Sequence, residues 1–171
     1  DGHRVATRKL QGMYEDGERH GAWRWWQHKG FVKKLVTYHQ GEEHGCFETY
    51  DKTGHLATRG SVDHGVKHGV FESFFPDGNK KVVGAYDAGE RDGTWTHFWG
   101  DGKVRRVEGF RKGRAHGPLK TWFATGEVER EGAHVDGRQD GAWRVFRRPG
   151  VLESERAYAG GLEYPDTFGT W

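Results

Sequence analysis

Residues 20–30 read HGAWRWWQHKG, and the same kind of segment recurs at a strict interval of 24 residues. The other copies are HGCFETYDKTG (44–54), HGVFESFFPDG (68–78), DGTWTHFWGDG (92–102), HGPLKTWFATG (116–126) and DGAWRVFRRPG (140–150). An unbroken period of this length is typical of a repeat architecture, in which each repeat is one supersecondary unit. The fold therefore depends on what a single unit builds.

Glycines mark the turns of this unit. Asp77-Gly78 and Asp101-Gly102 are strong hairpin signals, because glycine accepts the positive φ that such turns need. The segments between the turns are too short for helices and are rich in aromatic and β-branched residues. Each unit is predicted to form two antiparallel strands of roughly six or seven residues. The sequence thus predicts an all-β protein, an elongated and twisted single-layer antiparallel meander of tandem 24-residue hairpins.

The repeat frame divides the chain into three parts. Residues 12–158 are the predicted repeat array of about six units, residues 1–11 the predicted N-terminal cap, and residues 159–171 the predicted C-terminal cap or tail. Such arrays need caps because a terminal unit lacks a neighbour on one side. The segment EYPDTFGTW (163–171) departs from the repeat, and we expect it to cover the last edge strand.

Two columns of large side chains are predicted to be structural, because rings that pack from unit to unit supply burial that a single-layer sheet otherwise lacks. The first column is Trp23, Phe47, Phe71, Trp95, Leu119 and Trp143, and the second is Trp26, Tyr50, Phe74, Phe98, Trp122 and Phe146. The columns are three residues apart, so either a bulge intervenes or both faces carry rings. Strand glycines such as Gly12 and Gly132 are expected to leave room for a ring over the backbone.

Four further aromatic residues are the candidates for binding. Trp25 lies in a mostly polar column, and Phe75, Trp99 and Phe123 are the aromatic members of the column that follows the second aromatic one. A large exposed apolar strip usually marks an interaction site. The alternative is that these rings pack against a curled sheet or the tail.

Neither catalysis nor metal binding is predicted. The sequence holds no nucleophile, zinc-protease or phosphate-loop motif, so no enzyme and no cofactor are expected. His20, His44, His68 and His116 share one column with Asp92 and Asp140. Equivalent residues of adjacent units are about 10 Å apart, too far for one ion, since zinc–nitrogen bonds are about 2 Å long. We expect this column to form turn hydrogen bonds instead.

Charge and hydropathy narrow the class of partner. The chain has 27 Lys and Arg residues against 25 Asp and Glu residues, and this balance gives no reason to expect nucleic acid. Basic pairs such as Lys33-Lys34, Arg105-Arg106 and Arg147-Arg148 interleave with acidic residues. They indicate a solvated mixed-charge face or, alternatively, a surface for anionic lipid headgroups. No segment is apolar enough to predict a membrane span, and the single cysteine, Cys46, excludes an internal disulfide.

The spacing of glycine, Trp or Phe, and a second ring resembles the MORN repeat, and is most similar to its bacterial variant. DGERHGAWRWWQHKGFVKKLVTY (16–38) and AGERDGTWTHFWGDGKVRRVEGF (88–110) carry the resemblance, which covers residues 12–158 with departures at Leu119, His134 and Pro118. The resemblance implies a non-enzymatic scaffold that binds a protein partner, with antitoxin or immunity-type protein as a role that the scaffold itself would have. The alternative is a module that binds phospholipid or cell-envelope glycan through exposed aromatics. The compartment stays open between the bacterial cytoplasm and a mature exported form.

Overall fold

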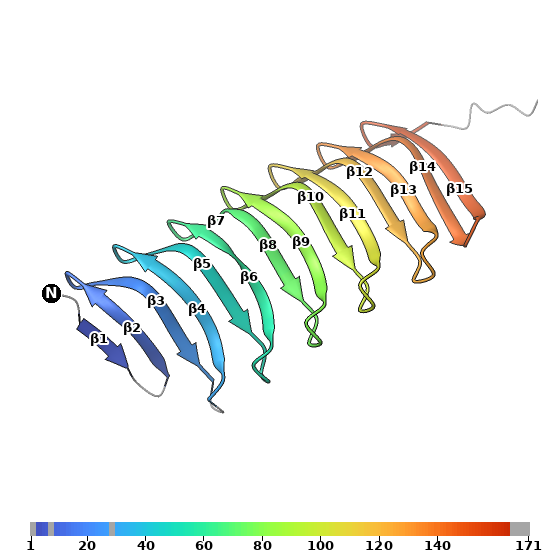
Figure 1. Ribbon diagram of the computed structural model, residues 1–171. Helices are drawn as coiled ribbons and strands as arrows, with labels where there is room; N and C mark the ends of the chain where they lie inside the picture. The colour runs from blue at the N-terminus through green and yellow to red at the C-terminus, as the bar shows by residue number, and fades with distance from the viewer. Residues whose placement is uncertain (1–2, 7–8, 28–29, 165–171) are drawn as a thin grey trace, which may run out of the picture. The chain divides into compact units, whose positions relative to one another are not determined.

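The structure, a computed structural model, describes residues 3–6, 9–27 and 30–164, and all regular secondary structure in these ranges is β-strand. The chain divides into two compact units, residues 1–90 (unit 1) and residues 91–171 (unit 2). Within each unit the strands pair antiparallel with their neighbours in chain order (Figure 1). The predicted all-β meander of antiparallel hairpins is confirmed.

The repeat strands are longer than the six or seven residues predicted, because most ladders run eight or nine residues from turn to turn. Unit 1 contains β1 (His3–Ala6), β2 (Leu10–Glu15), β3 (Glu18–Trp26), β4 (Val32–His39), β5 (Glu42–Tyr50), β6 (Leu56–Asp63), β7 (Val66–Lys67), β8 (Gly69–Phe74) and β9 (Lys80–Asp87). Unit 2 contains β10 (Glu90–Phe98, from Arg91 on), β11 (Val104–Arg111), β12 (Arg114–Trp122), β13 (Val128–Val135), β14 (Arg138–Arg148), β15 (Val151–Ala159) and β16 (Leu162–Glu163).

Short strands lie at both ends of the described chain. β1 pairs with β2, and β16 pairs with β15 through Tyr158 and Ala159. Residues 165–171, which make up most of the EYPDTFGTW segment, lie outside the described residues. The proposal that the terminal segments act as caps therefore stays a prediction.

Two kinds of connection alternate along the chain. At one end of the hairpins, two-residue turns have positive φ at both positions, as in His64-Gly65 (φ 47° and 77°) and Asp136-Gly137 (φ 50° and 87°). Positive φ at both residues is the conformation of type I′ turns, whose twist suits antiparallel hairpins. At the other end, four-residue loops are closed by two backbone hydrogen bonds: the N–H of Phe75, for example, donates to the carbonyl of Asn79, and the carbonyl of Phe75 accepts from the N–H of Gly78. Local turn chemistry thus sets the 24-residue frame that the sequence shows.

A register shift recurs near the loop end of each hairpin. Trp25 pairs with Lys34, but the next residue, Trp26, pairs with Val32, so the return strand β4 holds one extra residue, Lys33. The equivalent extra residues in the other hairpins are Ala57, Lys81, Arg105, Glu129 and Glu153. Because this bulge is in the return strand, the outgoing strand alternates regularly between its two aromatic columns, so that the columns point to opposite faces. Both possibilities that the sequence left open therefore apply: a bulge is present, and both faces carry rings. We call the face that carries the first column the tryptophan face.

The core of the tryptophan face is a repeated contact between a tryptophan and a glycine. Trp23 is fully buried, and its ring lies over Gly12, where a Cβ atom would sit 2.1 Å from the ring. The indole Nε1 of Trp23 donates to the carbonyl of Met13 at 3.2 Å, and the ring of Tyr14 packs edge-on at 5.0 Å. Trp143 makes the same contacts with Gly132, Ala133 and His134. The expectation that strand glycines accommodate rings is confirmed at both positions.

Cations cover the rings of the tryptophan face in several hairpins. The Arg19 guanidinium lies 4.9 Å from the Trp23 ring and 5.3 Å from the Tyr38 ring. In unit 2, Arg91 lies 4.9 Å from Trp95 and 5.1 Å from Phe110. A guanidinium over an aromatic face gains electrostatic attraction to the ring and shields it from water. These contacts help a single-layer sheet to stabilise its rings.

Candidate functional site

Three of the four binding candidates occupy the same place in their hairpins, the first residue of the four-residue loop. Phe75, Trp99 and Phe123 each donate and accept the two backbone hydrogen bonds that close this loop. All three side chains are half-buried. The loop end of each hairpin therefore presents a ring held by a rigid backbone.

Side chains from the bulge position pack against these rings. The Lys81 ammonium lies 5.8 Å from the Phe75 ring in unit 1, and the Arg105 guanidinium lies 4.6 Å from the Trp99 ring in unit 2. In the next hairpin the bulge residue is Glu129, and no cation–ring contact is found at Phe123 among the described residues. The ring of Phe123 thus differs from the other two in its surroundings.

Trp25, the fourth candidate, packs against the core of unit 1. Its ring lies 6.3 Å from Trp23 and 6.4 Å from Tyr38, and the Lys34 ammonium is 5.6 Å away. The side chain is half-buried and belongs to the shell around the Trp23 cluster. This packing gives Trp25 a structural contact that its polar column did not indicate.

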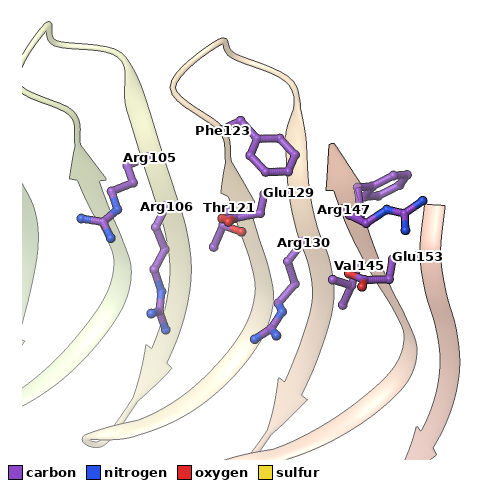
Figure 2. Close-up of a pocket in the computed structure, with 10 residues that line it drawn as sticks. Arg105, Arg106, Thr121, Phe123, Glu129, Arg130, Val145, Arg147 and Glu153 are labelled. Atoms are coloured by element: carbon purple, nitrogen blue, oxygen red, sulfur yellow. The ribbon is translucent and has the colours of Figure 1, made fainter. Parts of the chain in front are cut away.

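Phe123 lines a basic groove in unit 2, which Figure 2 shows in close-up. We define the basic groove by its lining residues, which come from β11 to β15 and enclose about 510 Å³: Arg105, Arg106, Thr121, Phe123, Glu129, Arg130, Val145, Phe146, Arg147 and Glu153. Arg106, Thr121, Arg130 and Val145 lie directly opposite one another on successive strands. Pairing across the ladder therefore fixes the spacing of the groove along the sheet.

The basic groove has an excess of positive charge. Its lining holds four arginines and two glutamates. Arg106 pairs with the carboxylate of Glu108, but Arg130 and Arg147 form no ion pair with any described residue. Unpaired guanidiniums offer planar, multiple donors to a carboxylate or phosphate. The groove is therefore suited to an acidic ligand.

The opposite face of unit 2 is built differently, because its charges are paired in register. Lys120 lies 3.0 Å from Glu131, Arg144 lies 3.5 Å from Glu131, and the Nε atom of Arg144 donates to Glu155 at 2.9 Å. These ion pairs hold the pKa of Glu131 below its usual value, with the hydrogen bond from Lys120 as the largest cause. This ladder is a mixed-charge face of the kind the sequence predicts, whereas the groove arginines lie on the tryptophan face.

A departure from the repeat lies beside the basic groove. Glu108 occupies the position of Gly12 and Gly132, and its partner across the ladder is Leu119, where other copies carry a ring. The Glu108 carboxylate is buried, with 6% of the residue exposed, and pairs with Arg106. The smaller leucine leaves space for a charged side chain where a tryptophan would need glycine. Sequence reasoning noted Leu119 as a departure but missed Glu108, although both break their columns.

Polar atoms that lack a hydrogen-bond partner gather around this departure. Among the described residues these buried atoms are His97 Nε2, Trp99 Nε1, Arg106 Nε and Thr121 Oγ1. His97, Arg106 and Thr121 are direct neighbours across β10, β11 and β12. Burial lowers the pKa of His97 despite the opposing effect of the Glu108 carboxylate. Arg106 and Thr121, two residues of this group, also line the basic groove.

A second group of polar side chains has the composition of a metal site. His44, Asp63 and His64 in unit 1 place one ligand atom each within 4.8 Å of the others. Among the described residues this is the one group of three or more such side chains found so close together. All three side chains are exposed, so that an ion has access to them.

Comparison with known proteins supports the MORN resemblance. Residues 67–88 match the family described as MORN repeat variant, which supports a MORN repeat protein, a class of non-catalytic repeats that mediate binding interactions. No curated protein matches the chain. A solved structure described as "Crystal structure of GtfA/B complex bound to UDP and GlcNAc" is similar over 74% of this chain and 23% of that one, with 15% identity and a TM-score of 0.26. The chain thus spans less than a quarter of that longer protein, and a likeness this weak supports no inference.

A search for helices long and apolar enough to cross a membrane finds none among the described residues.

Proposed function

We propose that the protein is a non-enzymatic repeat scaffold that binds another protein, and that the basic groove of unit 2 receives an acidic segment of this partner. The observation that carries the proposal is the pair of arginines, Arg130 and Arg147, that lack an ion-pair partner among the described residues beside the half-buried ring of Phe123. The match to a family of binding repeats supports the general role.

The chemistry of the groove suits a peptide with carboxylate side chains. Arginine forms bidentate hydrogen bonds with carboxylates, and an aromatic ring nearby supplies the apolar contact that anchors interfaces. Most lining residues are on paired strands, so that little conformational entropy is lost when a partner docks. The net positive charge also steers an acidic segment toward the site and makes association depend on ionic strength.

Within this proposal, the resemblance to the bacterial MORN variant favours an antitoxin- or immunity-type protein. The partner would then be a toxin whose docking surface carries Asp or Glu residues. Trp99, with Arg105 over its ring, lies one hairpin before Phe123 in unit 2 and is the next residue that such a partner would contact. Phe75, with Lys81 over its ring, is the equivalent contact in unit 1.

Affinity purification from the host in which the gene occurs tests the proposal. The bait proteins are the wild type, a double variant Arg130→Glu/Arg147→Glu, and Arg148→Glu as the matched control, because Arg148 is exposed next to Arg147 but does not line the groove. We expect a stoichiometric partner with the wild type and the control and its loss with the double variant. Recovery of no stoichiometric protein with the wild type would overturn the scaffold role. Retention by the double variant would overturn the groove as the site.

A second candidate function is binding to anionic lipid or cell-envelope glycan, and the cation–ring pairs Lys81–Phe75 and Arg105–Trp99 are the observation that favours it. Rings beside cations are typical of segments that insert at a charged interface. Sedimentation with phosphatidylserine vesicles, with neutral vesicles and with purified wall material tests this candidate. Absence of the protein from all three pellets eliminates it, and a Lys81→Ala/Arg105→Ala variant shows whether these pairs carry any binding.

A further inference from the structure

One column of the repeat reaches from each hairpin to the tight turn of the next. We call it the turn-contact column, and its members are His20, His44, His68, Asp92, His116 and Asp140. The Asp140 carboxylate accepts a hydrogen bond from the N–H of Gly160 at 3.4 Å, and His116 Nδ1 accepts one from the N–H of Asp136 at 3.4 Å. The predicted turn hydrogen bond therefore exists in these copies, but it joins the column to the turn about twenty residues further along the chain.

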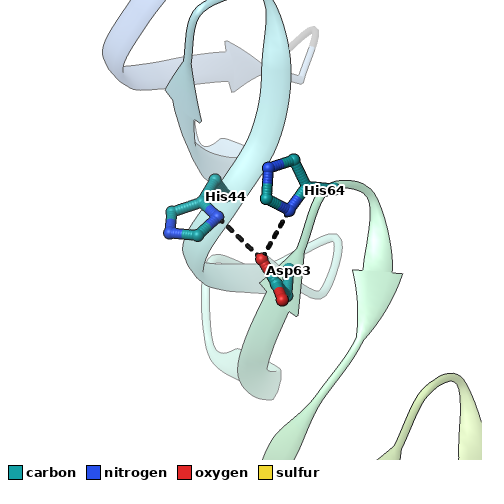
Figure 3. Close-up of side chains that lie close together, drawn as sticks. All are labelled: His44, Asp63 and His64. Carbon is teal, nitrogen blue, oxygen red and sulfur yellow. Dashed lines mark hydrogen bonds and ion pairs between the residues drawn. The ribbon is translucent and has the colours of Figure 1, made fainter.

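At His44 this contact between the column and the next turn brings together three side chains that can ligate a metal. The Nδ1 atom of His44 lies 3.0 Å from the Asp63 carboxylate, and the Nδ1 atom of His64 lies 2.7 Å from the same Oδ1 atom, as Figure 3 shows. Members of one column are too far apart to share an ion. The three residues here come instead from one column member and the turn that it contacts.

The backbone holds this arrangement in place. His64 and Gly65 form a type I′ turn with φ values of 47° and 77°. The N–H of Gly65 donates to the carbonyl of Glu43, the residue before His44, at 2.7 Å. This hydrogen bond fixes the turn directly beside β5, so that His44 and His64 are positioned before any ion arrives.

We propose that His44, Asp63 and His64 bind a divalent transition-metal ion of the zinc class through two Nδ1 atoms and one carboxylate oxygen. Zinc takes imidazole nitrogen and carboxylate oxygen at about 2.0 to 2.2 Å, which places tetrahedral ligand atoms about 3.3 Å apart. The two nitrogen–oxygen separations of 2.7 and 3.0 Å need a small outward shift of the side chains, and the ligand atoms of the two histidines lie within 4.8 Å of each other. Because the residues are exposed, water completes the coordination, as in open three-ligand sites.

The copies of the column at His68 and His116 offer fewer ligands at the same place. His68 contacts Asp87, but the following turn residue is Ala88. His116 contacts Asp136, but Val135 replaces the residue equivalent to Asp63. Each of these sites thus provides two ligands where the His44 site provides three, so His116 is a matched control for His44.

Calorimetric titration of the whole chain with Zn²⁺ tests the proposal. The variants are His44→Asn, Asp63→Asn and His64→Asn, because asparagine tolerates the left-handed conformation of residue 64. His116→Asn is the control. We expect one ion to bind the wild type and the control with equal affinity, and each of the three variants to bind about tenfold or more weakly. Circular dichroism of the metal-free proteins shows that all variants are folded.

Nitrogen-15 spectra of the histidine side chains provide a readout that weak binding to other histidines does not mimic. Zn²⁺ should shift the Nδ1 resonances of His44 and His64 while it leaves that of His116 unchanged. Absence of Zn²⁺ binding by the wild type, or equal affinity of the His64→Asn variant, overturns the site. Coordination through Nε2 at either histidine contradicts the proposed geometry.

Discussion

The ring of Trp143 lies so close over Gly132 that a Cβ atom at residue 132 would sit 2.3 Å from it. We predict that Gly132→Ala destabilises unit 2 by about 2 to 3 kcal/mol, because the buried indole must shift and strain its contacts. Urea unfolding followed by tryptophan fluorescence measures the change. Gly100→Ala is the matched control, since a Cβ atom added there would meet no other atom within 4 Å and the residue has no left-handed φ; it should change stability by less than about 0.5 kcal/mol. Equal stability of both variants would contradict the ring-over-glycine packing.

The hairpin architecture follows from the sequence because it rests on local turn chemistry. Turns such as Asp136-Gly137 adopt positive φ at both positions, a demand that glycine meets directly, and the 24-residue step repeats this demand along the chain. The tryptophan and glycine columns could also be predicted, because a ring needs a neighbour without a side chain. Such features require only one hairpin and its neighbour.

The return-strand bulge and the basic groove could not be predicted in the same way. Lys33-Lys34 and Arg105-Arg106 are adjacent residues of like charge, and the sequence does not show which of each pair is the extra residue of the bulge. The groove collects side chains from five strands and depends on their register. The sequence pattern also does not reveal the proposed metal site. Aligning the repeats groups residues at equivalent positions, whereas His44 contacts Asp63 and His64, which lie at different positions of the repeat, in and beside the next turn.

The pair Glu108 and Leu119 replaces a glycine and a ring, and we predict that the two residues are energetically coupled. Leu119→Trp alone should destabilise the protein by about 1 to 3 kcal/mol, because its ring competes with the buried Glu108 side chain. With Glu108→Gly added, the ring regains the bare backbone that Trp143 has at Gly132. A double-mutant cycle in urea should give a favourable coupling energy of about 1 kcal/mol or more. Strict additivity would show that the two departures are independent.

The Arg91 guanidinium lies over both Trp95 and Phe110, and we predict that this contact contributes to stability. Arg91→Ala should cost about 1 kcal/mol, since both the cation–ring attraction and the packing of the aliphatic stem are lost. Arg91→Lys should have a smaller effect because it keeps the charge but not the planar contact. Thermal unfolding measures the differences. Arg148→Ala serves as the control, because Arg148 is exposed and makes no cation–ring contact among the described residues; an equal loss in the control would rule out a specific role for Arg91.

We predict that unit 2 loses stability in mild acid, because two partly buried histidines have lowered pKa values. Burial is the largest cause that lowers the pKa of both His97 and His134 from the usual value of 6.5. When the pH falls below about 6.5, the unfolded chain takes up protons before the folded one does, so the free energy of unfolding decreases. The decrease continues until the pH falls through the lower pKa values of the folded state. Above pH 6.5 this contribution to stability is complete.

His134→Tyr isolates one of these two groups, because tyrosine occupies the same column in other repeats and keeps an aromatic ring against Trp143. Urea unfolding at about pH 7.5 and about pH 5.5 should show a smaller loss of stability for this variant than for the wild type. Glu72 and Glu131, whose pKa values are lowered from 4.5 chiefly by hydrogen bonds from Lys80 and Lys120, lose their contribution only in more acidic solution. The measurement at about pH 5.5 therefore reports on the histidines. An unchanged loss in the tyrosine variant would show that His134 stays as accessible to protons in the folded protein as in the unfolded chain.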